Sequence, residues 1–265
     1  MFKCNKTLVM GILNVTPDSF SDGGIFFDAS QAVKHALLMQ EQGADIIDVG
    51  GQSTRPGFTP ICAKEELERI APVIEGIRAI SDITISVDTF YPEVAQQAIA
   101  LGANIINDVS GFCSAQMIEL AAQTGVGCIV MHSEDVTQCA DVCYEVRNFF
   151  EFKTEQLKNA GIPTQNICFD PGIGFGKTYE QNLELIANFE RICLPDYAMM
   201  IAASRKRVIS NSCDISSPLE CDVASAVAHS ICVLSGATVV RAHNVPDAVQ
   251  AARITDKIKE IKRLG

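Results

Sequence analysis

Eight short β-rich runs alternate with eight longer amphipathic segments along the chain, and this alternation restricts the fold more than any other feature. A β-rich run followed by a segment of helical periodicity predicts a strand and the helix that leads to the next parallel strand. The predicted strands are Leu8–Asn14, Asp45–Val49, Thr84–Asp88, Asn104–Asp108, Gly127–Met131, Asn166–Asp170, Ala198–Ala202 and Thr238–Arg241. The predicted helices are Ser30–Gln42, Ala63–Ile80, Pro92–Leu101, Ala115–Gln123, Val142–Ala160, Tyr179–Phe189, Asp222–Ser235 and Pro246–Arg263.

The compact repeat of strand and helix favours closure of the sheet into a barrel. An open, doubly wound sheet uses the same alternation, so periodicity alone leaves that alternative open. The chain has 265 residues, the usual size of one closed barrel, and no Pro/Ser-rich or charged linker divides it. We therefore predict an α/β fold, a single-domain (β/α)8 TIM barrel over residues 1–265.

The composition and charge indicate a globular protein with small-molecule partners. Hydrophobic residues make up 48% of the chain and charged residues 20%, which is enough for a large core. The net charge of −11 opposes binding to nucleic acid or to an anionic membrane. No apolar stretch reaches the roughly 20 residues of a membrane helix. The first residues also lack a signal-peptide cleavage site, so we predict a cytoplasmic location.

The eleven cysteines are better explained as small core residues than as a disulfide framework. Their number is odd, the chain is large, and several of them, such as Cys128 and Cys168, lie in strand-like runs. We expect them to be reduced and mostly buried. Cys139 and Cys143 lack the spacing of a zinc knuckle, which disfavours a metal–thiolate site.

Glycine follows five of the predicted helices directly before the next strand. This position is typical of a C-terminal cap in the left-handed conformation, which glycine adopts without steric strain. The five glycines are Gly43, Gly102, Gly125, Gly161 and Gly236. We therefore interpret them as structural and assign no chemistry to them.

The predicted strands are apolar until their last residues and then become polar or charged. These polar strand ends are Asn14, Asp88, Asn107–Asp108, His132, Asp170, Ser204–Lys206 and Arg241–His243. One such end is more often a helix cap or a loop anchor than a functional group. In a (β/α)8 barrel, however, all of them lie on one rim, where active sites are built. The pattern therefore predicts a site at the C-terminal mouth.

Two long loops follow the first two strands and are suited to binding a phosphorylated ligand. The stretch Met10–Gly24 is rich in hydroxyls, carboxylates and glycine and is long enough to close over a ligand. The stretch Asp48–Gly57 contains glycines that permit close backbone approach. It also contains Thr54 and Arg55, which offer a hydroxyl and a fork of N–H donors to phosphate oxygens.

Both loops and the later strand ends resemble the signature motifs of the dihydropteroate synthases. The resemblance extends in order from Met10 to Val245. The later motifs are Ser86–Thr89, Ile106–Asp108, Asp170–Lys177, Ser204–Lys206 and Arg241–His243. It implies a transferase that joins 6-hydroxymethyl-7,8-dihydropterin diphosphate to p-aminobenzoate and releases diphosphate.

The resemblance assigns the pterin to Asp88, Asn107, Asp170 and Lys206. A pterin edge alternates hydrogen-bond donors and acceptors, so Asp170 can accept two parallel hydrogen bonds from it while Asn107 completes the contact. Lys206 would donate to ring acceptors, and Asp88 would favour a cationic transition state. The alternative for Asp88 and Asp170 is N-capping of the following helix.

The resemblance also implies a binding site for the diphosphate and Mg²⁺. The implied diphosphate contacts are Asn14, Thr54, Arg55, Arg241 and His243. Mg²⁺ favours oxygen ligands, so the Asn14 amide oxygen is the implied protein ligand of the metal. The catalytic set implied in this way is Asp88, Lys206, Arg241 and His243. The other histidines, His35, His132 and His229, are interpreted as structural.

The p-aminobenzoate site is implied by residues from three loops. They are Phe20, Pro56, Phe175, Ser204, Lys206 and Arg207. The aromatic residues and Pro56 would surround the ring, and a helix N-terminus at residues 204–207 would favour the carboxylate. A loop aromatic packed on the barrel is an equally good interpretation of Phe20.

Four positions depart from the pattern of the family. Gln52 occupies the place of Glu, Ala242 that of Val, and Asn244 that of Asp. Arg207 replaces a small hydroxyl residue where the p-aminobenzoate carboxylate should bind. We hypothesise that Arg207 points outward or contacts that carboxylate, and that binding of sulfonamides is altered in either case.

Two alternative functions fit a pterin-binding barrel. One is a methyltetrahydrofolate-dependent methyltransferase that works with a corrinoid protein, which has no use for the phosphate-binding loops. The other is a non-catalytic pterin-binding paralogue. Relatives in the family commonly form dimers through barrel helices, so the resemblance also implies a homodimer.

Overall fold

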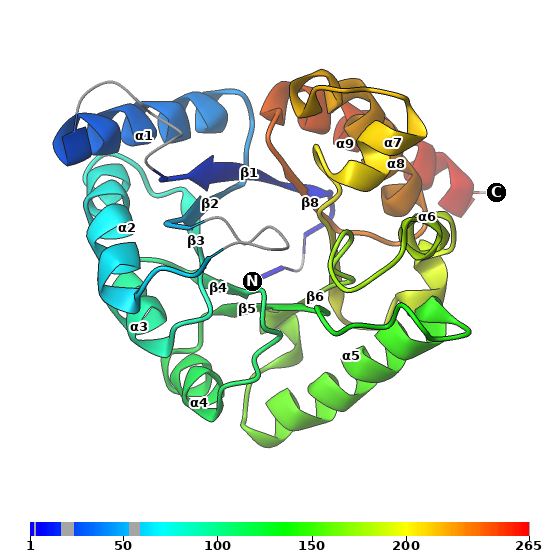
Figure 1. Cartoon of the computed structure of the whole chain (residues 1–265), viewed down its shortest axis with the longest axis horizontal. Helices are drawn as coiled ribbons and strands as arrows, with labels where there is room; N and C mark the ends of the chain where they lie inside the picture. Colours follow the sequence, from blue (N-terminus) through cyan, green and yellow to red (C-terminus); the bar gives the residue numbers. More distant parts are fainter. Residues whose placement is uncertain (3, 17–23, 53–58, 265) are drawn as a thin grey trace.

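The eight predicted strands form a closed parallel barrel in the computed structural model, which describes residues 1–2, 4–16, 24–52 and 59–264. Each strand pairs with the next, and β8 pairs with β1 to close the barrel (Figure 1). The strands are β1 Leu8–Asn14, β2 Ile46–Gly50, β3 Thr84–Asp88, β4 Ile105–Asp108, β5 Gly127–Met131, β6 Ile167–Asp170, β7 Ala198–Ile201 and β8 Val239–Ala242. The prediction of a TIM barrel is confirmed, and every strand boundary agrees within one residue.

Helices surround the barrel on its outer side (Figure 1). They are α1 Gly24–Glu41, α2 Ala63–Arg78, α3 Pro92–Ala100, α4 Ala115–Thr124, α5 Val142–Asn159, α6 Tyr179–Ala187, α7 Arg207–Ser212, α8 Asp222–Leu234 and α9 Val245–Leu264. Periodicity did not predict α7, because a helix of 6 residues is too short to show a helical period, but the resemblance implied a helix N-terminus at residues 204–207. None of the helices in the described ranges has the length and apolarity needed to cross a membrane.

The barrel interior changes from apolar to polar along its axis. An apolar cluster inside the barrel includes Ile46, Ile105, Cys168 and Val239, and Phe2 packs against it. The residues two positions later on these strands share the same face, because side chains alternate along a strand. These later residues are Asp48, Asn107, Asp170 and Arg241. The strands therefore carry a polar layer toward their carboxyl ends, above an apolar floor.

The glycine and cysteine predictions are largely confirmed. All five helix-terminal glycines have positive φ angles, from 67° at Gly125 to 121° at Gly236. All eleven cysteines are free thiols. Five are buried, two are half-buried and four are exposed, so the expectation that most are buried holds only in part. Cys4 and Cys113 are among the exposed ones, because they lie in loops rather than in strands.

Candidate active site

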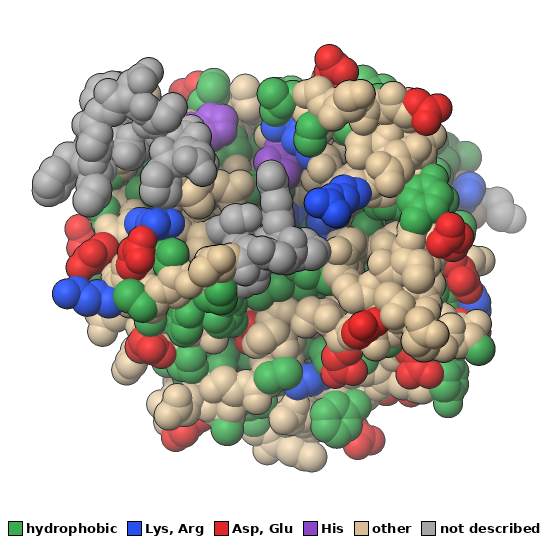
Figure 2. All heavy atoms as spheres, in the orientation of Figure 1, with side chains coloured by type: hydrophobic (Ala, Val, Ile, Leu, Met, Phe, Trp, Pro, Cys, Tyr) green, Lys and Arg blue, Asp and Glu red, His purple; other side chains and the backbone are tan. Residues whose placement is uncertain are grey.

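Strand register brings the polar ends of four neighbouring strands side by side at the barrel mouth. Asn14 pairs with Gly50, Gly50 with Asp88, and Asp88 with Asn107. Gly50 therefore lies between Asn14 and Asp88 and has no side chain to fill the space between them. A Cβ at Gly50 would lie 3.4 Å from the Asp88 Cβ and 3.9 Å from the Asn14 Oδ1. Figure 2 shows histidine side chains and some of the basic side chains near the upper centre of one face, while most acidic side chains lie nearer its margin.

Arg241 joins two carboxylates inside the mouth. Its Nε lies 2.6 Å from Asp48 Oδ2, and its Nη2 lies 2.8 Å from Asp88 Oδ2. Asn107 Nδ2 also donates to Asp48 Oδ2, at 3.0 Å. Asp48 is fully buried and Asp88 is 6% exposed. Asp48 is not among the residues predicted from the sequence, although a charged residue inside an otherwise apolar strand was the signal that could have identified it.

Burial and neighbouring charges shift the pKa values of Asp88 and Arg241 in opposite directions. Burial raises the pKa of Asp88 to about 7, and Arg241 offsets part of that increase. Burial alone would lower the pKa of Arg241, but the charges of Asp48 and Asp88 raise it above its usual value. Arg241 therefore remains a guanidinium, with two carboxylates holding its plane in place.

Asp170 and Lys206 form the other half of the polar layer. Asp170 is 2% exposed, and its Oδ1 accepts a hydrogen bond from Gly172 N at 2.8 Å. Burial raises the pKa of Asp170, and Lys206 counteracts this effect. The Lys206 Nζ donates to Ile173 O and lies 4.8 Å from the centroid of the Phe175 ring. Burial lowers the pKa of Lys206 to about 8.

Neither Asp88 nor Asp170 caps a helix. The N-cap of α3 is Tyr91, and the N-cap of α6 is Thr178. Asp170 instead binds the backbone two residues further along its own loop. The N-cap interpretation of these two carboxylates is therefore wrong, because each following helix begins after a longer loop.

Ser204 and His243 connect the ends of β7 and β8. Ser204 Oγ lies 3.0 Å from His243 Nδ1 and accepts a hydrogen bond from His243 N at 3.1 Å. The next residue, Arg205, forms two hydrogen bonds of 2.8 Å with the carboxylate of Asp222. Asn244 donates to the same carboxylate at 3.1 Å. Arg205 and Asn244 thus fix the loop that carries Ser204 and Lys206.

Gln52 is fixed at the base of the second loop by α2. Its Nε2 donates to Glu66 Oε2 at 2.5 Å, and Arg69 donates to Gly51 O at 2.8 Å. Burial raises the pKa of Glu66 to about 7. An amide suits this position, because a second carboxylate beside Glu66 would place two like charges in the core.

The predicted site residues that the structure describes lie around one mouth. They are Asn14, Asp88, Asn107, Asp170, Phe175, Ser204, Lys206, Arg241 and His243. Arg207 is exposed at the first residue of α7, whose N-cap is Lys206. Phe20, Thr54, Arg55 and Pro56 lie outside the described residues.

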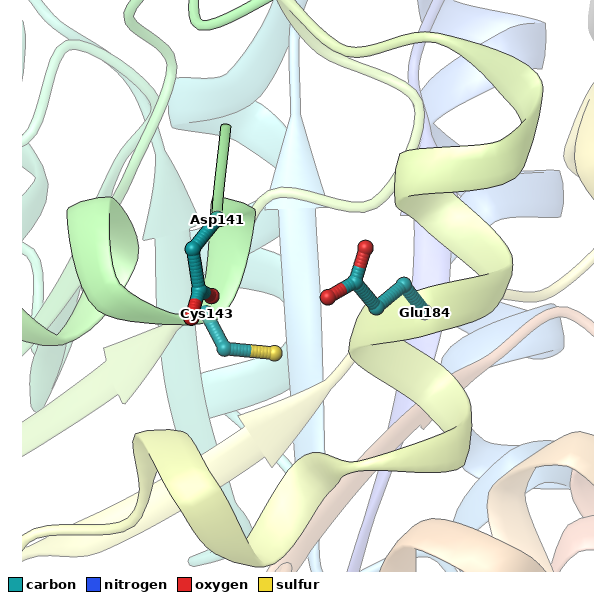
Figure 3. A group of neighbouring side chains, drawn as sticks. All are labelled: Asp141, Cys143 and Glu184. Carbon is teal, nitrogen blue, oxygen red and sulfur yellow. The ribbon is translucent and has the colours of Figure 1, made fainter. Parts of the chain in front are cut away.

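A second group of polar side chains lies away from the mouth. Figure 3 shows Asp141, Cys143 and Glu184, whose possible ligand atoms lie within 4.8 Å of one another. Arg191 already pairs with Asp141 at 2.5 Å, and Asp141 caps α5 by accepting from Tyr144 N. Burial raises the pKa of Cys143 to about 11, so the thiol is protonated at neutral pH. This arrangement is explained by helix capping and ion pairing.

Comparison with known proteins gives consistent results. Residues 10–243 match the family described as pterin binding enzyme. A dihydropteroate synthase of Clostridium beijerinckii is 44% identical over 256 residues, which cover 96% of this chain and 94% of the relative. A solved dihydropteroate synthase from Clostridium difficile, in the presence of pteroic acid, is 38% identical and superposes with a TM-score of 0.92. The match covers 96% of this chain and 97% of that structure. A dihydropteroate synthase structure from Xanthomonas albilineans, with 4-aminobenzoic acid, is 38% identical with a TM-score of 0.91. The match covers 96% of this chain and 93% of that structure.

Proposed function

We propose that this chain, which belongs to the dihydropteroate synthases among the pterin binding enzymes, condenses 6-hydroxymethyl-7,8-dihydropterin diphosphate with p-aminobenzoate. The products are 7,8-dihydropteroate and diphosphate. The observation that carries the proposal is the polar layer at the barrel mouth. It combines Asp170 and Asn107, which suit a pterin edge, with Arg241, which suits an anionic leaving group.

In this reaction a carbon–nitrogen bond forms as the carbon–oxygen bond to diphosphate breaks. The aromatic amine is a weak nucleophile, so the enzyme gains most by orienting the reactants and stabilising the charges that develop. We assign Asp170 and Asn107 to orienting the pterin, and Asp88 to stabilising the cationic carbon. Arg241 and His243 offset the charge of the departing diphosphate, while the amine proton is released as the new bond forms.

The residues at the mouth fit a magnesium ion. Asn14 offers an amide oxygen beside the Asp88 carboxylate, and oxygen donors are what Mg²⁺ prefers. We propose that Asn14 holds the ion, which when bound neutralises charge on the diphosphate. Thr54 and Arg55 complete our proposed diphosphate site.

We propose that p-aminobenzoate binds beside Lys206. Phe175, whose ring lies next to the Lys206 ammonium, supplies an aromatic surface, and Ser204 lies on the same rim. Phe20 and Pro56 are proposed to cover the ring from the two long loops. Arg207 is close in sequence to this pocket and is the proposed source of altered inhibitor binding.

The assay that tests this function is the release of diphosphate. The purified chain, incubated with the pterin diphosphate, Mg²⁺ and p-aminobenzoate, should form diphosphate and dihydropteroate in equal amounts. A methyltransferase would release no diphosphate and would transfer a methyl group from methyltetrahydrofolate. A non-catalytic paralogue would bind the pterin diphosphate and form no product.

The reaction should have a bell-shaped dependence on pH. Burial raises the pKa of Asp88 to about 7 and lowers the pKa of Lys206 to about 8. Asp88 acts as a carboxylate and Lys206 as an ammonium, so both have the active charge only between these values. We expect kcat/KM to fall below about pH 7 and above about pH 8. The acidic limb should disappear in Asp88→Asn, and a flat profile in the unmodified enzyme would contradict these assignments.

Arg207→Ser should change p-aminobenzoate binding only modestly. Arg207 is exposed, and an exposed charge contributes at most about 1 kcal/mol, or roughly fivefold in affinity. We expect KM for p-aminobenzoate to rise by up to about fivefold, and sulfonamide inhibition to change with it. Steady-state kinetics with and without a sulfonamide measures both effects. Identical constants for the two proteins would end the hypothesis.

We also propose a cytoplasmic homodimer in which residues 1–265 form one domain. The dimer proposal is supported by rows of exposed apolar side chains at helical spacing on two consecutive helices. On α8 these are Val223, Val227, Ile231 and Leu234, and on α9 they are Ile254, Ile258 and Ile261. Apolar rows of this kind are typical of a helix that packs against a partner.

A further inference from the structure

The loop between β6 and α6 packs directly on the backbone that follows β5. Gly172 and Gly176 have φ angles of 66° and 54°. A Cβ at Gly172 would lie 2.0 Å from His132 O, and a Cβ at Gly176 would lie 2.2 Å from Glu134 O. Val136 N also donates to Gly176 O at 2.9 Å. The two backbones therefore meet without intervening side chains at these points.

Lys177 places its ammonium group in the seam between these two segments. The Nζ lies 2.9 Å from Phe175 O, 3.2 Å from His132 O and 3.3 Å from Gly172 O. It also lies 3.0 Å from His132 Nδ1. An ammonium has three N–H donors, and here four acceptors from both segments share them. No described carboxylate forms a salt bridge with Lys177, so its polar contacts are with carbonyls of both segments and with the His132 ring.

His132 is held as a neutral acceptor for this lysine. Burial lowers the pKa of His132 to about 3, and the charge of Lys177 acts in the same direction. The neutral ring can accept at Nδ1 while Nε2 carries the proton. The ring packs edge-on against Phe149 at 5.0 Å, and His132 N donates to Asp170 O at 2.9 Å. His132 is thus fixed by its ring and by its backbone.

The same loop supplies two contacts of the Lys206 ammonium group. Ile173 O accepts a hydrogen bond from Lys206, and the Phe175 ring lies beside the Lys206 ammonium. Lys177 binds the carbonyl of Phe175 and the carbonyl of Gly172, the residue whose N–H donates to Asp170. Displacement of the loop would therefore move Phe175 and the support of Lys206 together.

We propose that Lys177 and His132 are positioning residues that hold the β6–α6 loop in the conformation that presents Phe175 and Lys206 to p-aminobenzoate. This inference rests on the proposed function and adds to it two residues that do not touch the reacting atoms. Burial lowers the pKa of Lys177 to about 7, and the charge of Asp170 acts in the opposite direction. The titratable groups that act on Lys177 are Asp170, Lys206, Cys139 and Glu134, besides its contact with His132.

The test compares Lys177→Met with Lys153→Met. Lys153 is the control, because it is a buried lysine on α5 that likewise donates to a backbone carbonyl, Phe112 O at 3.2 Å, and binds none of the acceptors of Lys177. For Lys177→Met we expect KM for p-aminobenzoate to rise by about tenfold, the effect of losing one charge-assisted hydrogen bond. The Kd of the pterin diphosphate, measured by calorimetry without p-aminobenzoate, should change less than about twofold. Lys153→Met should leave both constants unchanged.

Two further variants separate positioning from a general loss of structure. Lys177→Arg keeps a cation and should recover part of the p-aminobenzoate affinity. His132→Phe keeps the packing against Phe149 but removes the Nδ1 acceptor, and should raise the same KM by about threefold. Equal KM values in Lys177→Met and the unmodified chain, or parallel changes in both lysine variants, would overturn the inference. Absence of turnover in the unmodified chain would instead refute the proposed function.

Discussion

Replacing Asp170 with Asn is expected to reduce kcat/KM for the pterin diphosphate by roughly 10²- to 10³-fold while leaving the fold as stable as before. The carboxylate is the proposed acceptor of two parallel hydrogen bonds from the pterin, and an amide cannot accept both. Burial already raises the pKa of Asp170, so folding does not favour its charged form, and Asn keeps an oxygen that can accept from Gly172 N. Steady-state kinetics and thermal unfolding together measure the two parts of the prediction.

Asp108 provides the matched control for this substitution. It is also a fully buried carboxylate at a strand end, but it accepts hydrogen bonds from Ser110 N and Phe112 N, at 2.8 and 3.0 Å, in its own loop. We expect Asp108→Asn to lower the free energy of unfolding by about 1 kcal/mol and to leave the KM for the pterin unchanged. If Asp170→Asn lost stability and kept its KM, Asp170 would be a structural residue like Asp108.

Replacing Arg241 with Met is expected to remove both activity and stability. The guanidinium lies between Asp48 and Asp88, at 2.6 and 2.8 Å, and its loss leaves two buried carboxylates without their partner. Breaking a buried ion pair in this way lowers the free energy of unfolding by about 3–5 kcal/mol. The proposed diphosphate site also loses a cationic donor, so kcat/KM should fall by at least about 10³-fold.

The pH dependence identifies the cause of the stability loss. Burial raises the pKa of Asp88 in the folded state above that in the unfolded state, and removal of Arg241 raises it further. A carboxyl with a raised pKa favours folding at low pH, and this contribution is lost as the pH rises toward the folded-state value. Because the folded-state pKa of Asp88 is already about 7 in the intact protein, the stability deficit of Arg241→Met should increase as the pH rises above about 7. Urea unfolding measures it, and Asp48→Asn in the same chain should recover part of the stability but none of the activity.

The positions of the strands were predictable because the physical signal is local. Strands of a parallel barrel are covered on both sides, so each is a nearly continuous apolar run with a polar end. The closing of the sheet makes these ends converge, which is why Asp88, Asn107 and Asp170 could be identified from the sequence. Their convergence depends on the fold class rather than on the detailed packing.

The roles of Asp48 and Lys177 depend on partners that the sequence pattern does not show. Asp48 lies two residues before its strand ends, and its partners Arg241 and Asn107 are far away in the sequence. Lys177 binds mainly backbone carbonyls, which any sequence provides. The charged Asp48 in an apolar strand could have been noticed in the sequence, but the partners of Asp48 and Lys177 become known only from the structure.

The most direct test of the proposed site is a crystal structure of this enzyme with a pterin and p-aminobenzoate bound. We expect the amino-pyrimidinone edge of the pterin to lie against Asp170 and Asn107, and the p-aminobenzoate ring to lie between Phe175 and Lys206. A pterin bound outside the barrel mouth, or bound there without contact to Asp170, would contradict the proposed site.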